Sequence, residues 1–339
     1  MKQQTNINQL VDHLFRHESG KMVAVLSRLL GLQNLETAQD IVQDTLLQAM
    51  NTWGFKNIPD NPQGWLYRVA KNKAVDFLRR RKKFNAISPQ YAYLLESEYS
   101  LSPTVKNLFL ENEIQDSQLR MMFACCHPSI PEESQIALTL KTLCGLSIHE
   151  IARAFLTNDE TISKRIYRAK EKIKTEKIEM DVPPADELRH RLDAVLKSLY
   201  LLFNEGYNSS HPDQLIREDL CEEAMRLCNL ITGHPLTAFP RSKALLALMC
   251  FQASRLNARL DDKGNIIVLN TRTAVNGTAP WSKKVLILWT QRQNLLKLPR
   301  ITWKPLSPLF MQLHPRLNKP TGKVFIIYMK CFTRCSLTR

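Results

Sequence analysis

A long C-terminal segment without acidic residues limits how much of this chain can fold as an ordinary globular protein. Asp262 is the last acidic residue of 339, and residues 263–339 contain no Asp or Glu. The same segment holds 14 Lys and Arg, so it carries nearly all of the formal net charge of +15. A stretch this long without acids would arise by chance on the order of once in 10⁴ chains of ordinary composition. We therefore expect the native fold to lie within residues 1–262.

Three interpretations of the tail are open. A basic arm that binds nucleic acid is normally polar and flexible, whereas this tail contains the apolar run Val285–Trp289 and scattered prolines. A membrane-surface segment is a second interpretation. The third, which we favour, is translation in an altered reading frame, because the codons for Arg300–Pro308 could encode an amphipathic helix in a shifted register. We predict that residues 263–339 are not a native domain and that the end of the chain is altered or disordered.

The predicted fold class is all-α, with several small helical units. Helical periodicity covers residues 1–83 and 117–177, and a third helical block, 178–262, follows Pro183 and Pro184. Residues 84–116 are mixed and are predicted to be a linker. In the third block, helices are expected at Leu215–Leu230 and Ala244–Phe251. An earlier helix there has the apolar stripe Leu188, Leu192, Val195, Leu196, Leu199, Leu202 and Phe203.

Several classes of protein are disfavoured by what the sequence lacks. No apolar run reaches the ~18 residues of a membrane span, and Met1–Gln9 has no signal-peptide core, so we predict a cytoplasmic protein without membrane contact. The eight cysteines show no CxxC pairing, and Cys125, Cys126 and His127 are too close together to surround one metal ion easily. Common nucleotide-binding and hydrolase motifs are also missing. We expect no metal, no cofactor and no enzymatic activity.

A helix-turn-helix is the most specific local pattern. Ser147 and Glu150 have the spacing of a capping box, which predicts a first helix over Ile148–Phe155. Thr157 or Asn158 is suited to cap a second helix, predicted from about Asp159 to Lys174 with Ile162, Ile166 and Ala169 turned inward. The outer face would then present Thr161, Ser163, Lys164, Arg165, Arg168 and Lys170. Such a layout favours reading a major groove, although a solvated basic helix is the simpler alternative.

A second cationic helix is predicted over Trp65–Lys83, where eight basic residues accompany one acid. Before it, Asn51–Gly64 is predicted to be a polar loop that carries Trp53 and is suited to trapping an unstacked base. A charge run alone is usually a solvated face, and an aromatic residue in a loop is usually a packing anchor. Because the two features are adjacent, they favour binding to single-stranded nucleic acid.

These patterns resemble the extracytoplasmic-function (ECF) sigma factors of bacterial RNA polymerase over about residues 8–177. The resemblance rests on Thr37–Met50, Pro62–Lys83 and Ala137–Ile173, three motifs in the order and spacing of that family. Asp116–Leu140, Phe203–Tyr207 and Ser254–Gly264 are also similar to the subgroup with a long C-terminal helical extension. In that subgroup the extension continues well past the point where this chain loses its acids.

The resemblance implies a division into sigma region 2 (1–83), a linker (84–116), the region 4 helix-turn-helix (117–177) and a helical extension (178–262). It also implies two partners, core RNA polymerase and promoter DNA. The implied polymerase-binding residues are Asp40, Gln43, Asp44 and Gln48. The implied contacts to the −10 element are Trp53, Arg68, Lys71, Asn72, Arg79, Arg80 and Arg81. The implied contacts to the −35 element are Thr161, Ser163, Lys164, Arg165 and Arg168.

Two alternatives remain beside a sigma factor that directs transcription initiation. The first is a helix-turn-helix regulator that binds duplex DNA without polymerase, which would need a dimerising helix and a palindromic site. The second is a helical interaction scaffold with no role on DNA, for which the salt dependence of DNA binding would be shallow.

Overall fold

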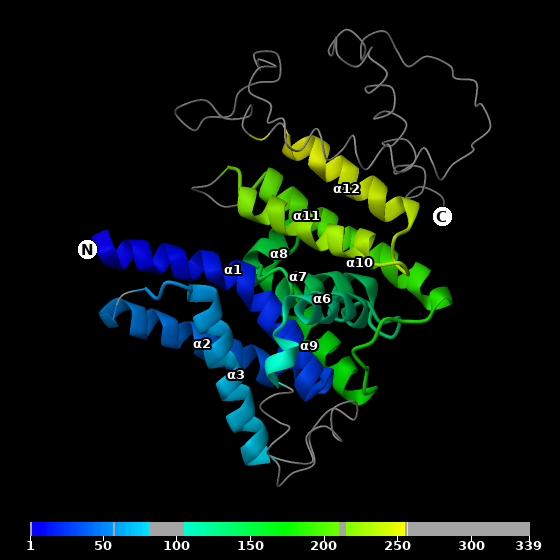
Figure 1. The fold of residues 1–339 in the computed structure, drawn as a ribbon. Coiled ribbons are helices and arrows are strands. Elements are labelled where there is room, and N and C mark those ends of the chain that lie inside the picture. The colour runs from blue at the N-terminus through cyan, green and yellow to red at the C-terminus, as the bar shows by residue number, and fades with distance from the viewer. Residues whose placement is uncertain (1, 57, 82–104, 210–214, 255, 257–339) are drawn as a thin grey trace, which may run out of the picture. The chain divides into compact units, whose positions relative to one another are not determined.

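The computed structural model describes residues 2–56, 58–81, 105–209, 215–254 and 256 (Figure 1). The described residues form helices and contain no strand, which confirms the all-α prediction. The predicted tail, 263–339, lies outside the described residues. The helices are α1 (Lys2–Leu30), α2 (Leu35–Lys56), α3 (Pro62–Arg81), α6 (Glu111–Cys125), α7 (Glu132–Thr142), α8 (Ile148–Ala154), α9 (Asp159–Thr175), α10 (Ala185–Tyr207), α11 (Glu218–Gly233) and α12 (Pro240–Ala253).

The chain divides into two compact units. The first comprises residues 1–205 and 210–214, and the second comprises 206–209 and 215–339. The first unit therefore holds α1 to α9 and most of α10, whereas the second holds the end of α10 together with α11 and α12. No described helix is long and apolar enough to cross a membrane.

Helices α1, α2 and α3 pack together at the start of the first unit. Met22, Leu26 and Leu29 of α1 are fully buried, and their spacing of three to four residues forms one apolar face of the helix. The helix ends at Leu30, and the next residue, Gly31, has a φ of 86° that is readily adopted only by glycine. A short 3-10 helix, η1 (Leu32–Asn34), then turns the chain into α2.

Helices α6 to α9 form the next part of the first unit. Met121, Met122 and Phe123 of α6 are buried without exposed surface, and α7 contacts both α6 and α9. Helix α6 begins at Glu111, so it includes the last six residues of the segment predicted to be a linker. Two acidic residues in its first turn suit the positive end of the helix dipole and favour this start. In α10, the seven residues of the predicted apolar stripe are all buried.

In the second unit, the backbone at Gly206 lies close to the backbone at the start of α11. A Cβ on Gly206 would lie 2.7 Å from the carbonyl oxygen of Arg217 and from the amide nitrogen of Cys221. Only glycine fits at that position without movement of the backbone. Helices α11 and α12 pack together, and the Cys228 thiol donates to the carbonyl of Ser242 at 3.6 Å. The predicted third block of helices is therefore present.

Candidate nucleic-acid interface

The helix-turn-helix is held together by its own caps. The Ser147 hydroxyl accepts from the Glu150 amide at 3.2 Å, and the Glu150 carboxylate accepts from the Ser147 amide at 2.7 Å. Asn158 caps α9 by accepting from the Thr161 amide at 2.8 Å. Leu156, in the turn between the helices, has a φ of 52° and is 96% exposed. The capping box, the Asn158 cap and the start of α9 agree with the sequence prediction, and the first helix ends one residue earlier than predicted.

The outward face of α9 presents several of the predicted −35 residues to solvent. Ser163, Lys164 and Arg168 are exposed, and Lys164 pairs with Glu160 at 2.6 Å across one helical turn. Tyr167, which the sequence analysis did not select, is 63% exposed on the same helix. Its position three residues after Lys164 and next to Arg168 was the signal that could have identified it. A phenol on this face can contact bases or phosphates beside the cations.

Arg165 and Thr161 are placed differently from the other predicted −35 residues. The Arg165 side chain is 24% exposed, forms an ion pair with Glu133 of α7 and lies over the Phe155 ring at 5.6 Å from its centre. Thr161 is half-buried at the first turn. Arg165 thus braces α9 against α7 and the end of α8 in this structure, whereas Arg168 is exposed and has no ion-pair partner among the described residues.

Helix α3 carries the second cationic face, and residues next to its N-terminus fix where the helix begins. Pro62 is the first residue of the helix, a position where proline is well tolerated, and the Asn61 side chain accepts from the Gly64 amide at 2.8 Å. Four of the predicted −10 residues are exposed, and Lys71 is half-buried. Arg81 ends the helix, and its side chain lies outside the described part. The exposed residues are Arg68, Asn72, Arg79 and Arg80.

The expected base-trapping loop is shorter than predicted, and Trp53 does not lie in it. Helix α2 continues to Lys56, so Trp53 is helical and only 1% exposed. Its ring meets Trp65 of α3 edge to face, with the centres 5.4 Å apart. Burial of a large aromatic surface between two helices outweighs the alternative of leaving it in water. Trp53 is therefore a core residue here, and its predicted stacking on a base is corrected.

A buried polar cluster fixes the orientation of α3 on α1. Glu18 of α1 is 6% exposed, and its carboxylate accepts from the Tyr67 hydroxyl at 2.5 Å and from the Gln63 amide at 3.1 Å. Lys21 donates to the other Glu18 oxygen at 2.9 Å. Burial, and then the charge of Glu18, raises the pKa of Tyr67 far above its usual range, so the phenol stays a donor. The sequence analysis missed this cluster because Glu18 and Tyr67 are 49 residues apart.

The predicted polymerase-binding residues form an exposed stripe on α2. Asp40, Gln43, Asp44 and Gln48 are all exposed. Leu47 and Met50, which were not predicted, are 50% and 40% exposed beside them. The Asp44 carboxylate lies 3.7 Å from the Lys73 ammonium of α3. Apolar side chains rimmed by polar ones are typical of protein interaction sites, so the surface suits a protein partner better than a nucleic acid.

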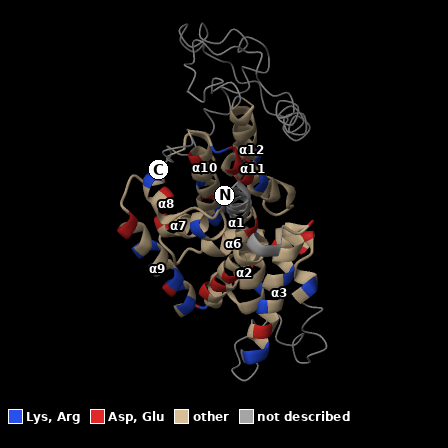
Figure 2. Cartoon of the chain, turned by 90° about the vertical axis from the view of Figure 1, so that its left-hand side faces the viewer, with Lys and Arg blue, Asp and Glu red and all other residues tan. Residues whose placement is uncertain are grey.

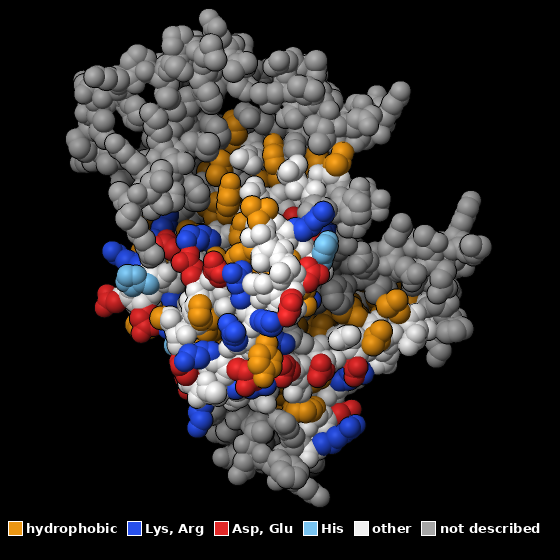
Figure 3. All heavy atoms as spheres, turned by 180° about the vertical axis from the view of Figure 1, so that it is seen from behind, with side chains coloured by type: hydrophobic (Ala, Val, Ile, Leu, Met, Phe, Trp, Pro, Cys, Tyr) orange, Lys and Arg blue, Asp and Glu red, His pale blue; other side chains and the backbone are white. Residues whose placement is uncertain are grey.

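Charges on these surfaces are mixed rather than of one sign. Figure 2 shows the positions of Lys and Arg along α3 and α9, with acidic residues interspersed along the same helices. On the face drawn in Figure 3, acidic and basic side chains also lie next to one another. The cationic character is thus concentrated on two helices, and binding to nucleic acid would depend on those helices rather than on the total charge of the chain.

The cysteines offer no reactive or metal-binding site among the described residues. Cys125 and Cys126 are fully buried and lie 3.8 Å from the hydroxyls of Thr142 and Thr139, respectively. Burial raises the pKa of the Cys125 thiol to about 12. A thiol that stays protonated is a poor nucleophile and a poor metal ligand. No group of three or more His, Cys, Asp or Glu in the described part is arranged to hold a metal ion.

Comparison with known proteins assigns the segments that contain the two cationic helices, α3 and α9, to known protein families. Residues 14–84 match sigma-70 region 2, residues 120–173 match sigma-70 region 4, and residues 191–281 match a family of unknown function, DUF6596. The ECF RNA polymerase sigma-E factor of Escherichia coli is 31% identical over 139 residues, which cover 40% of this chain and 70% of that protein. The chain belongs to the ECF sigma factors.

Two further relatives have additional sequence outside the match. An uncharacterized protein of Rhizobium meliloti is 34% identical over 239 residues, which cover 70% of this chain and 55% of the relative. The ECF RNA polymerase sigma factor SigE of Mycolicibacterium smegmatis is 26% identical over 164 residues, 48% of this chain and 60% of that factor. The chain thus spans between half and two thirds of these two relatives. No solved structure matches it significantly.

In this ECF sigma factor, region 2 covers most of α1 together with α2 and α3, and region 4 covers the end of α6, then α7, α8 and nearly all of α9. The match to DUF6596 begins within α10 and ends at residue 281, 19 residues beyond Asp262. The match therefore extends into the acid-free tail, and a change of reading frame, which alters every residue after one codon, fits this match best if it lies near or beyond residue 281.

Proposed function

We propose that this protein binds core RNA polymerase in the cytoplasm and directs it to promoter DNA for transcription initiation. One observation carries the proposal. A single chain of the ECF family presents an exposed cationic face on α3 in region 2 and a capped helix-turn-helix in region 4. The chemistry of RNA synthesis would belong to the polymerase, so the factor itself would need no catalytic residue.

Region 4 would recognise the −35 element through α9. A recognition helix enters the major groove with its outward side chains toward base edges and phosphates. Ser163, Lys164 and Arg168 are the exposed predicted residues that support this assignment, and we add Tyr167. Arg165 would act mainly by holding α9 at the correct angle, because its guanidinium is paired with Glu133.

Region 2 would hold the melted −10 element on α3. Arg68, Asn72, Arg79 and Arg80 share the exposed side of the helix, which would let cations contact phosphates while the Asn72 amide contacts a base. Flipping a base out of a duplex costs a few kcal/mol, and contacts to phosphates and unstacked bases would offset that cost. Residues 58–61, between α2 and α3, are the described part of the loop that could receive a flipped base.

Helix α2 would dock on the polymerase through Asp40, Gln43, Asp44 and Gln48. Leu47 and Met50 would add apolar contacts within the same stripe. Two modest DNA-binding regions on one polymerase raise each other's effective concentration. We also propose the division into regions 2 and 4 with a connecting segment and a C-terminal helical extension. The sequence analysis placed a non-native end from residue 263, and the family match to residue 281 moves the proposed start of that end beyond the match.

In vitro transcription with core polymerase and a genomic promoter library tests the proposal. We expect promoter-dependent products that are lost in the double variant Arg68→Ala and Asn72→Ala. Lys106→Ala is a matched control, because Lys106 is exposed but lies on neither α3 nor α9, and it should transcribe like the wild type. Absence of any promoter-dependent product would contradict the proposal. DNA binding without retention of core polymerase in a pull-down would favour a polymerase-independent regulator.

A further inference from the structure

Two neighbouring acids at the start of α7 contact two different helices. Glu132 forms an ion pair with Lys197 of α10, and Glu133 forms one with Arg165 of α9. All four residues belong to the first compact unit. Consecutive residues of a helix point about 100° apart, so one turn of α7 can contact both helices at once. The first turn of α7 therefore connects α10 to the recognition helix α9.

The two connected helices belong to different family matches. Both acids of α7 and most of α9 lie within the match to sigma-70 region 4, which ends at residue 173. Lys197 lies within the match to DUF6596, which begins at residue 191. The connection through α7 thus joins the helical extension to the part of the protein that we assign to the −35 element.

A buried arginine gives α10 a second contact near α7. Arg191 is buried, and so are Ala194 and Ser198, which share its face of the helix at spacings of three and four residues. Burial, and then the charge of Arg191, lower the pKa of His127 in the loop between α6 and α7. Because Arg191 is close enough to influence that imidazole, this face of α10 lies beside the loop that leads into α7.

That loop is itself fixed by hydrogen bonds. The Gln135 amide, which is buried, donates to the carbonyl oxygens of His127 at 2.9 Å and Ile130 at 2.7 Å. The His127 ring and the Ser129 hydroxyl share a hydrogen bond of 2.7 Å. Closely packed interiors transmit small displacements instead of absorbing them. A shift of α10 would therefore reach the start of α7.

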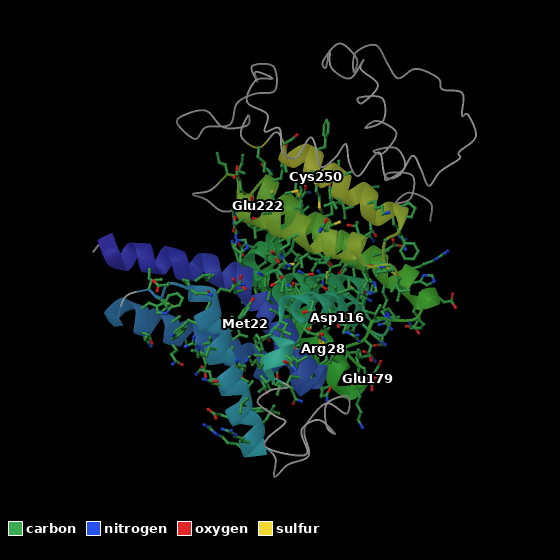
Figure 4. The ribbon with its side chains drawn as sticks, viewed as in Figure 1. Met22, Arg28, Asp116, Glu179, Glu222 and Cys250 are labelled. Atoms are coloured by element: carbon green, nitrogen blue, oxygen red, sulfur yellow. The ribbon has the colours of Figure 1, made fainter. Side chains whose placement is uncertain are left out.

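The chain between α9 and α10 is attached to α6. Met180 is buried, and the Asp181 carboxylate lies 2.5 Å from the Arg120 guanidinium, which also pairs with Asp116 at 2.8 Å. Figure 4 labels Asp116 on α6 and Glu179 in the segment that leads to Asp181. Helix α10 is thus joined to region 4 by an anchored segment and not by a free tether.

The arginine at the other end of the connection lies in the half of α9 that would read DNA. Arg165 is in the second turn of the helix, and the N-terminal residues of a recognition helix are those that reach base edges. Its guanidinium lies over the Phe155 ring while it pairs with Glu133. Hydrogen bonds to bases need donor–acceptor distances of about 2.7–3.2 Å. The angle at which Arg165 holds α9 therefore decides how well such bonds can form.

We infer that Lys197 of the extension is a positioning residue for the −35 element, which acts on the recognition helix through the first turn of α7. The inference rests on the proposed function. Lys197 acts without contacting DNA: it holds the start of α7, and α7 holds α9 at its angle to the groove. The extension is then part of the −35 reader and not a separate appendage.

The test uses core polymerase reconstituted with full-length variants. Fluorescence anisotropy compares a promoter fragment found in the transcription assay with a copy whose −35 element is scrambled, and the ratio of the two affinities is the −35 preference. Lys197→Glu replaces attraction to Glu132 by repulsion. Arg189→Glu is the matched control, because it makes the same change of charge at an exposed residue of α10 about two turns earlier.

We expect Lys197→Glu to reduce the −35 preference about two- to fivefold, the scale of one exposed ion pair, and Arg189→Glu to leave it unchanged. Adding Glu132→Lys to Lys197→Glu should restore the preference, because the pair re-forms with its charges reversed. In a Glu133→Gln background, Lys197→Glu should have no further effect, since the connection to α9 is already broken. Such non-additivity is expected only of residues that act through one another.

Three results would overturn the inference. The first is that Lys197→Glu and Arg189→Glu have the same −35 preference. The second is that Glu132→Lys does not rescue Lys197→Glu, and the third is that the effect of Lys197→Glu is as large with Gln at position 133 as with Glu. Failure of the proposed function looks different, since polymerase reconstituted with the wild type would then show no promoter-dependent binding at all.

Discussion

The substitution Tyr67→Phe tests whether the buried Glu18 cluster sets the position of the DNA-binding helix of region 2. It removes one hydroxyl, the donor that lies 2.5 Å from the Glu18 carboxylate. The ring, whose centre is 5.5 Å from that of Phe109, remains in place. The hydroxyl also accepts from the Gln63 amide at 3.1 Å, so the change removes one hydrogen bond between α1 and α3 together with a weaker, neutral one within α3.

The expected loss follows from the chemistry of the pair. A hydrogen bond to a charged group contributes about 1.5–3 kcal/mol to stability. Gln63 and Lys21 still donate to Glu18 in the variant, so the carboxylate is not left without partners. We therefore expect the lower part of the range, about 1.5 kcal/mol, which corresponds to roughly tenfold in an opening equilibrium.

Native-state hydrogen exchange measures this loss locally. The amides of α3 should exchange about tenfold faster, whereas those of α9 should keep their protection. Tyr167→Phe is the matched control, because that side chain is 63% exposed and its hydroxyl has no buried acceptor among the described residues. Less than a twofold change in α3, or an equal change in α3 and α9, would refute the argument that Glu18 and Tyr67 anchor this helix specifically.

Three further predictions concern region 4. Leu156→Gly should raise the free energy of unfolding by up to about 1 kcal/mol. The gain comes from removing a side chain from a left-handed, exposed backbone position, and the greater entropy of glycine in the unfolded chain reduces it. A lower melting temperature would contradict this. Arg168→Ala should weaken binding to a −35 duplex by about 1–3 kcal/mol without changing the melting temperature. Arg165→Ala should lower the affinity and the melting temperature together. Fluorescence anisotropy of the duplex measures the affinity, and calorimetry measures the melting temperature. Burial, and then the charge of Arg191, lower the pKa of His127 from its ordinary 6.5. The unfolded chain therefore takes up a proton at His127 first as pH falls, so the contribution of His127 to stability should be constant above about pH 6.5 and decline below it. His127→Gln should flatten that decline in urea titrations at several pH values.

The parts of the fold that were predictable from sequence are those determined by neighbouring residues. Ser147 and Glu150 identify a helix start because their side chains cap the backbone three residues away. Asn158 identifies the next start for the same reason. The inward faces of α9 and α10 follow from apolar periodicity, which needs no knowledge of the partner helix. These features combined to give the helix-turn-helix and the order of the motifs.

Trp53 shows where local reasoning fails. Its surroundings, with a glycine and two prolines nearby, are typical of a loop. Its actual state is set by Trp65, which is twelve residues away and belongs to another helix. Once α3 provides an aromatic partner, burying Trp53 favours continuing α2 by another turn. The helix end is therefore a tertiary effect.

The same reasoning explains why the cationic face of α9 was predicted correctly as a face but not residue by residue. Periodicity places Lys164, Arg165 and Arg168 outside the apolar stripe, and it treats them as equivalent. Glu133 of α7 makes them different, because it lies within reach of Arg165 and not, among the described contacts, of the other two. An arginine paired within the protein must lose that pair before it can bind a phosphate, and the loss reduces the net gain. The strongest DNA contact of this helix should therefore come from Arg168, which is exposed and has no ion-pair partner among the described residues, whereas the exposed Lys164 is paired with Glu160.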